Sequence, residues 1–173
     1  MSGHNKWSQI QHKKSVTDAK RGALFSKLLA AISVAAKQEL NPSANPRLRS
    51  AIEKAKENKV PQENIERAIS KAAEQKNLEE VLIEAYGPEG VGLIIEAITD
   101  NKNRTTSEIR HLLDENGAKM ATPGSVLWSF EKQGMEWKAK FQQPISEEGK
   151  IKLQKLIEIL ENHDDVQRVI SNF

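Results

Sequence analysis

The chain contains no cysteine and no long apolar run. Without cysteine it has neither disulfides nor thiolate zinc sites. No apolar stretch approaches the roughly 20 residues that a membrane-spanning helix needs. The basic N-terminal stretch is not followed by the apolar segment of a secretory signal. We therefore expect a cytoplasmic protein without a membrane partner.

Catalytic and metal-binding motifs are also missing from the sequence. It has no glycine-rich phosphate loop of the P-loop kind and no paired carboxylates in an apolar setting. Ser107 and His111 are one helical turn apart, but helix capping already explains the residues around them. No two histidines have the spacing of helical metal ligands; they are His4, His12, His111 and His163. We predict a non-enzymatic protein with no cofactor, metal or small-molecule substrate.

Charge is distributed unevenly along the 173 residues. Residues 1–76 contain 15 Lys and Arg against 7 Asp and Glu, a net charge of +8. Residues 77–173 contain 11 against 17, a net charge of −6. A chain of this length can form two small domains with real cores. We therefore expect a basic domain at 1–76 that binds phosphate and a second domain at 77–173.

The basic half is predicted to be helical. Apolar residues recur every three or four positions in three segments. Thr17 is expected to cap the first helix, while Asn45 with Pro46 is typical of the start of the second. The three helices are expected at about 17–38, 46–57 and 61–73.

The second half changes to the period of β-strands. The segments 79–86 and 91–99 are joined by Gly87-Pro88-Glu89-Gly90, which favours a turn. The second of these strands is apolar on both faces, so we expect it to be central in its sheet. Thr105 and Glu108 form a capping box for a helix that ends before Gly117.

Two further strands are expected on either side of Gln133-Gly134, in "SVLWSFE" and "MEWKAKF". Trp128 and Trp137 alternate with polar neighbours and are expected in the core of the sheet. A helix at about 146–161 and the strand "VQRVIS" follow. From residue 91 the order is β-α-β-β-α-β, so the fold class is α+β: a three-helix domain, then a ferredoxin-like domain with an extra N-terminal strand.

Two segments carry the candidate nucleic-acid contacts. In the basic half, an arm and two helix starts supply cations that could bind phosphate. The arm also contains a tryptophan that could stack on a base or anchor the arm. These residues are Lys6, Trp7, Lys13, Lys14, Lys20, Arg21, Lys27, Arg47 and Arg49. In the second half, Asn101, Asn103 and Arg104 precede a helix start, where an anion can bind. The alternatives are a solvated basic surface and an ordinary strand-to-helix loop.

Several of these motifs resemble the YebC family. They are "SGHNKWSQIQHKKSVTDAKRGALFSKL", "NPRLRSAIEKAKENKVPQENIERAI", "EAYGPEGVGLIIEAITDNKNRTTSEIRHLL", "GSVLWSFEKQG" and "DDVQRVI". The resemblance implies a bacterial cytoplasmic protein that regulates gene expression, with mitochondrial relatives that activate translation. It also implies a third domain after the position of Gly134, which this sequence lacks.

Two functions follow from the resemblance. The first is a ribosome-associated translation factor that binds ribosomal RNA and assists the synthesis of difficult sequences such as proline runs. The second is a DNA-binding transcriptional regulator, which is disfavoured because no helix shows a clear polar reading face. A protein-interaction module that docks a basic partner through the acidic half is a third possibility.

Overall fold

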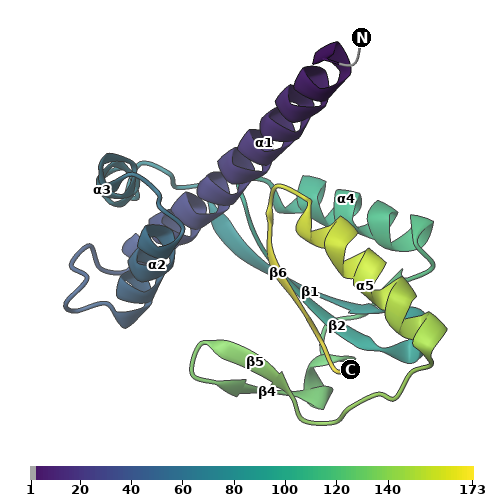
Figure 1. Ribbon diagram of the computed structural model, residues 1–173. Coiled ribbons are helices and arrows are strands. Elements are labelled where there is room, and N and C mark those ends of the chain that lie inside the picture. Colours follow the sequence, from purple (N-terminus) through teal and green to yellow (C-terminus); the bar gives the residue numbers. More distant parts are fainter. Residues whose placement is uncertain (1–2) are drawn as a thin grey trace. The chain divides into compact units, whose positions relative to one another are not determined.

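The computed structural model describes the backbone of residues 3–173 and the side chains from residue 17 onward (Figure 1). The chain divides into two compact units, Met1–Glu74 and Gln75–Phe173. Within the described residues, no helix is both long and apolar enough to cross a membrane.

The first unit consists of three helices, as predicted. They are α1 (Gly3–Ala36), α2 (Pro46–Glu57) and α3 (Gln62–Ser70). The helix expected to start at Thr17 begins instead at Gly3, because neither proline nor glycine interrupts residues 4–21. Asn45 caps α2 as predicted: its side chain accepts the N–H of Leu48 at 3.0 Å, with Pro46 in the first turn.

The core of this unit is small. It joins Ile32, Ala35 and Ala36 of α1 to Leu48 and Ala55 of α2, with Val60, Ile65 and Ala72. Among the described residues, α1 contributes to this core only from Phe25 onward. Residues 17–24 are all exposed, including Leu24.

The second unit is built on a four-stranded sheet. Its strands are β1 (Glu79–Tyr86), β2 (Gly92–Thr99), β3 (Lys119–Met120) and β6 (Val166–Ser171), in the order β3-β1-β2-β6. Every neighbouring pair is antiparallel. The one-turn helix η1 (Pro88–Gly90) joins β1 to β2. β2 lies inside the sheet, as its apolar sequence predicts.

Two helices and a hairpin cover the two faces of β2. Leu93 and Ile95 pack against α4 (Lys102–Glu115) and α5 (Glu147–Glu161), which lie together along one face of the sheet (Figure 1). Ile94 points the other way, into a cluster with Val126 and Phe130. The α+β fold class is therefore confirmed, with helices first and the sheet after them.

The hairpin region differs from the prediction in two respects. β4 (Phe130–Gln133) and β5 (Glu136–Ala139) form a separate two-stranded sheet and do not join the main one. Trp137 packs against the core as expected. The prediction for Trp128 is wrong: it lies in a short helical turn, η2 (Leu127–Ser129), and its side chain is 64% exposed. Alternation of apolar and polar residues favours an extended segment, but it shows neither which strand the segment pairs with nor that 127–129 form a turn.

Candidate nucleic-acid interface

Some of the predicted basic contacts of α1 lie before Phe25, where the helix begins to pack against the core, and one lies after it. Lys20 and Arg21 are exposed, whereas Lys27 is half-buried. Arg21 falls on the apolar side of the helix, but it precedes Phe25, where the core starts. Its guanidinium therefore faces solvent. The other predicted contacts of the arm, Lys6, Trp7, Lys13 and Lys14, have side chains outside the described residues.

The start of α2 is fixed by Asn45. Besides capping the helix, its buried side-chain amide donates to the carbonyls of Ala35 at 2.9 Å and Glu39 at 2.8 Å. These bonds join the end of α1 to the start of α2. They hold Arg47, which is half-buried, and Arg49, which is exposed, in the first turn. Both arginines thus sit on a rigid helix start.

The part of the helical unit whose side chains are described carries more basic than acidic residues. Residues 17–76 contain 12 Lys and Arg against 7 Asp and Glu. Arg67 is paired with Glu63 on the same helix at 2.6 Å. Arg49 donates to the main-chain carbonyl of Pro42 at 3.2 Å. An exposed cationic helix start is suited to binding phosphate, but the contacts themselves stay a prediction.

The second predicted site is the loop that leads into α4. Its helix begins at Lys102, and Asn101 is the cap: its side chain accepts the N–H of Arg104 at 3.1 Å. The prediction that Thr105 caps this helix is wrong. Thr105 is fully buried, in the second turn. Asparagine is at least as good a cap as threonine, so the helix extends back to it.

Arg104 is held by acceptors of the protein itself. Its Nη2 donates to Oδ2 of Asp165 at 2.9 Å and to the hydroxyl of Thr99 at 3.2 Å. Its Nη1 lies 3.1 Å from a carboxylate oxygen of Asp100. The Thr105 hydroxyl donates to the same Asp165 oxygen at 2.6 Å. These bonds tie the start of α4 to the start of β6.

The charges of this network shift two pKa values. The hydrogen bond to Asp165 and its negative charge raise the pKa of Arg104 further. Burial pushes the pKa of Asp165 upward, but hydrogen bonds from Thr105 and Arg104 and the charge of Arg104 outweigh it, so this pKa is lowered. At neutral pH both partners are therefore charged. Asn103 is exposed beside this network, and the role of Asn101, Asn103 and Arg104 as nucleic-acid contacts stays a prediction.

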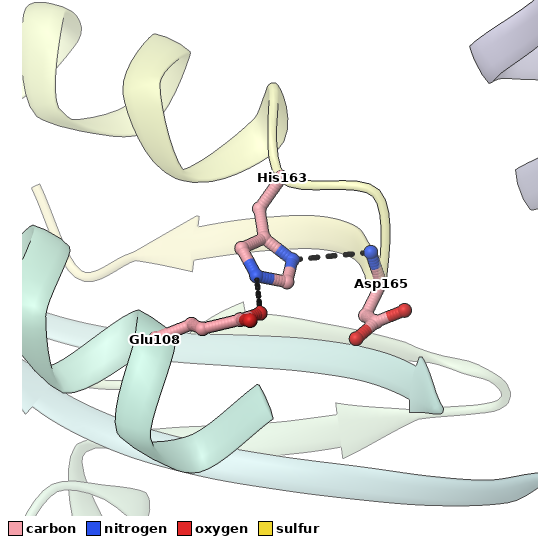
Figure 2. A group of neighbouring side chains, drawn as sticks. All are labelled: Glu108, His163 and Asp165. Atoms are coloured by element: carbon pink, nitrogen blue, oxygen red, sulfur yellow. Dashed lines mark hydrogen bonds and ion pairs between the residues drawn. The ribbon is translucent and has the colours of Figure 1, made fainter. Parts of the chain in front are cut away.

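A cluster that the sequence spacing did not reveal lies next to Arg104. Glu108 of α4 meets His163 and Asp165 of the α5–β6 turn, along a pocket of about 450 Å³ (Figure 2). One ligand atom of each lies within 4.8 Å of the others, a distance that a metal ion could bridge. Residues from separate elements cannot be paired by helical spacing, so only the fold brings them together.

The hydrogen bonds of this cluster do not suit a metal. The backbone N–H of Asp165 donates to Nδ1 of His163 at 3.1 Å, so the neutral ring carries its proton on Nε2. That nitrogen lies 2.8 Å from Glu108 Oε2. A metal on Nε2 would require the proton on Nδ1, facing another N–H donor. The cluster instead fits a structural bond between α4 and the α5–β6 turn.

The fold and sequence match known proteins. A crystal structure of a conserved hypothetical protein from Aquifex aeolicus superposes with a TM-score of 0.82 at 35% identity, covering 90% of this chain and 91% of that one. Probable transcriptional regulatory proteins of Thermoanaerobacter pseudethanolicus and Koribacter versatilis are 52% and 50% identical over 139 and 137 residues. These matches cover 78% of this chain in both cases, and 56% and 55% of the relatives. The chain thus spans about half the length of the curated relatives it matches.

Two family models cover most of the chain. The model of the TACO1/YebC protein N-terminal domain matches residues 5–75. The model of the TACO1/YebC second and third domain matches residues 78–136, so the match ends two residues after Gly134. The structure then continues through β5 directly toward α5. On these matches, the chain belongs to the TACO1/YebC family.

Proposed function

We propose that the protein is a non-enzymatic regulator of gene expression that binds nucleic acid through its helical unit. The observation that carries this proposal is that both helices expose cations: Lys20 and Arg21 on α1 and Arg49 on α2. The regulatory names of the relatives agree with it. The second unit would be a stable scaffold without catalytic chemistry of its own, and it would fix the orientation on the target through the loop at 101–104.

Ribosomal RNA is the target that we favour. No helix in the sequence shows a polar reading face rich in Arg, Asn and Gln beside a helix-turn-helix pattern, which disfavours readout of a DNA major groove. The resemblance to the YebC family supports the same choice. The protein would act in the cytoplasm as a ribosome-associated translation factor that assists difficult sequences such as proline runs.

The mechanism proposed for this role is positioning. Basic side chains of the helical unit would engage RNA phosphates, and the N-terminal part of α1 would enter an RNA cavity. Binding energy would then shift the local geometry of the ribosome toward peptide-bond formation. This mechanism needs no proton transfer and no cofactor from the protein.

A DNA-binding transcriptional regulator is the alternative. It rests on the names of the curated relatives, which are called probable transcriptional regulatory proteins. The same cations would contact DNA phosphates, with sequence preference supplied by groove shape or by other parts of the assembly.

Salt dependence of binding tests the proposed interface. The variant Lys20→Ala/Arg21→Ala/Arg49→Ala should weaken binding to a ribosomal RNA fragment. The slope of log affinity against log salt should become shallower by roughly 0.7–0.9 for each lost phosphate contact. The control is Lys119→Ala/Lys155→Ala, which removes exposed lysines from the second unit.

The outcomes separate the candidates. An unchanged slope in the triple variant would show that the helical unit is not the contact surface. Sedimentation of the tagged protein with large ribosomal subunits, lost after nuclease treatment, would support the translation factor. Retention on promoter duplexes in place of ribosomes would support the DNA-binding regulator.

A further inference from the structure

Two aromatic rings lie exposed beside the hairpin of the second unit. Trp128, in η2, is 64% exposed, and Phe141, two residues after β5, is 51% exposed. Their ring centroids are 5.6 Å apart, and the ring planes are tilted by 41°. Large aromatic side chains normally contribute to a core, so an exposed pair in contact is informative.

Trp128 is exposed but firmly held. Its indole Nε1 donates to the carbonyl of Ser125 at 2.8 Å, and the hydroxyl of Tyr86 donates to the same carbonyl at 3.0 Å. The backbone N–H groups of Val126 and Leu127 donate to the carboxylate of Glu84 at 2.7 and 2.8 Å. Because the indole N–H is satisfied within the protein, the surface offers only the faces and edges of the ring.

Lysines accompany these rings. The ammonium of Lys140 lies 5.5 Å from the ring centroid of Phe141, and Lys138 is exposed on β5. Among the described residues, no ion pair joins a carboxylate to either lysine. Glu131 is opposite Lys138 in the hairpin register and is the acidic group that would compete with a ligand there. Two lysines beside exposed aromatic rings are unusual within residues 77–173, because the net charge of this segment is −6.

We propose that Trp128 and Phe141 form a stacking site for an unpaired base of a single-stranded nucleic acid, with Lys140 next to its phosphate. This inference rests on the proposed function, because it assumes that the target is a nucleic acid. Aromatic rings stack on any base, and stacking on a base makes no contact with the 2′-hydroxyl that distinguishes RNA from DNA. Single-stranded RNA and DNA should therefore bind alike, whereas a base inside a duplex cannot reach the rings.

The site can be observed directly by ¹⁹F NMR. The full chain is labelled with 5-fluorotryptophan, and its signals are assigned with single Trp→Phe variants. Addition of a short oligoadenylate, as RNA or as DNA, should shift the Trp128 signal and leave that of Trp137 in place. The corresponding duplex should leave the Trp128 signal unchanged.

Variants supply the matching affinities. Trp128→Ala should bind the single-stranded oligonucleotide roughly 5- to 150-fold more weakly, the range expected for one lost stacking partner. Trp128→Phe keeps a ring and should retain most of the affinity. Ile151→Ala removes another exposed apolar side chain, on α5, and should bind as the wild type does. Near-ultraviolet circular dichroism establishes that each variant is folded.

Failure of this inference is distinguishable from failure of the proposed function. Oligonucleotide binding that needs Lys20, Arg21 and Arg49 but leaves the Trp128 signal unmoved would overturn the stacking site alone. Absence of binding to any nucleic acid would overturn both. Self-association that Trp128→Ala abolishes, without an effect on oligonucleotide affinity, would assign the aromatic pair to a protein partner and overturn the stacking site.

Discussion

Arg104 and Asp165, 61 residues apart in the chain, form an ion pair with 2.9 Å between Nη2 and Oδ2. The pair joins the start of α4 to the start of β6. Next to it, Glu108 and His163 join α4 to the end of α5. The loop predicted to contact nucleic acid is therefore also a structural junction. Experiments on this loop must separate loss of binding from loss of stability.

The substitution Thr105→Val tests how much the buried part of this junction contributes to stability. Thr105 is fully buried, and its hydroxyl donates to Asp165 at 2.6 Å. Valine keeps the shape of the threonine side chain, but the carboxylate of Asp165 loses one hydrogen-bond donor. We expect the free energy of unfolding in urea to fall by about 1–3 kcal/mol. Ser107→Ala, at an exposed position of the same helix, should change it by no more than about 0.5 kcal/mol. Equal stability of Thr105→Val and wild type would contradict the assigned bond.

Acid should weaken the same junction. The pKa of Asp165 is lowered in the folded protein, although burial alone would raise it. An acid with a lowered pKa stabilises the fold above its unfolded pKa of about 3.9, and this contribution disappears as the pH falls through the folded pKa. We expect wild type to be more stable than Asp165→Asn at neutral pH, with the difference shrinking below about pH 4. The measurement is urea unfolding across pH, with the carboxyl followed by NMR; titration at or above the usual pKa would refute the network.

Asn103→Ala isolates the predicted binding role of the loop. The Asn103 side chain is exposed, and the cap of α4 is the side chain of Asn101 instead. We expect weaker RNA binding, by the roughly 0.5–1.5 kcal/mol of one hydrogen bond, without a change in thermal stability. Fluorescence anisotropy and a thermal melt check the two parts. Ser107→Ala is the exposed control, and unchanged affinity in Asn103→Ala would leave the loop with its structural role alone.

Glu84→Gln should release the segment that holds Trp128. The buried carboxylate of Glu84 accepts the N–H groups of Gly124 at 2.5 Å, Val126 at 2.7 Å and Leu127 at 2.8 Å. Glutamine replaces one acceptor oxygen with a donor, so at least one of these three N–H groups loses its partner. We expect a loss of about 1.5–3 kcal/mol in unfolding free energy. Glu79→Gln, at the exposed start of β1, is the control; amide hydrogen exchange at 124–127 that stays as slow as in wild type would contradict this role.

Much of the fold could be predicted from local sequence signals. Asn45 followed by Pro46 predicted the start of α2, since both the cap and the fixed backbone angle act within one turn. The apolar run of β2 predicted a strand covered on both faces. Gly117 and Gly134 were expected at a helix end and a hairpin turn, and both have positive φ, 71° and 63°.

Other features could not be predicted because they depend on distant partners. Thr105 looked like a helix cap, but burial against Asp165 gave it another role. Trp128 had the alternation of a core strand residue, yet the carboxylate of Glu84 binds the backbone N–H groups of Val126 and Leu127 just before it, where the chain forms η2. The Glu108–His163 pair could not be predicted from the sequence either, because its members come from separate elements.

The sequence alone determined the helical first half, the β-rich second half, the uneven charge and the family, because propensity, capping, periodicity and charge are local properties of the chain. Only the tertiary structure decided that the hairpin stands apart from the main sheet, that Arg104 is held by Asp165, and that Trp128 is exposed on a rigid turn. These outcomes depend on which distant groups satisfy each buried donor and acceptor, and that choice is made only when the chain packs.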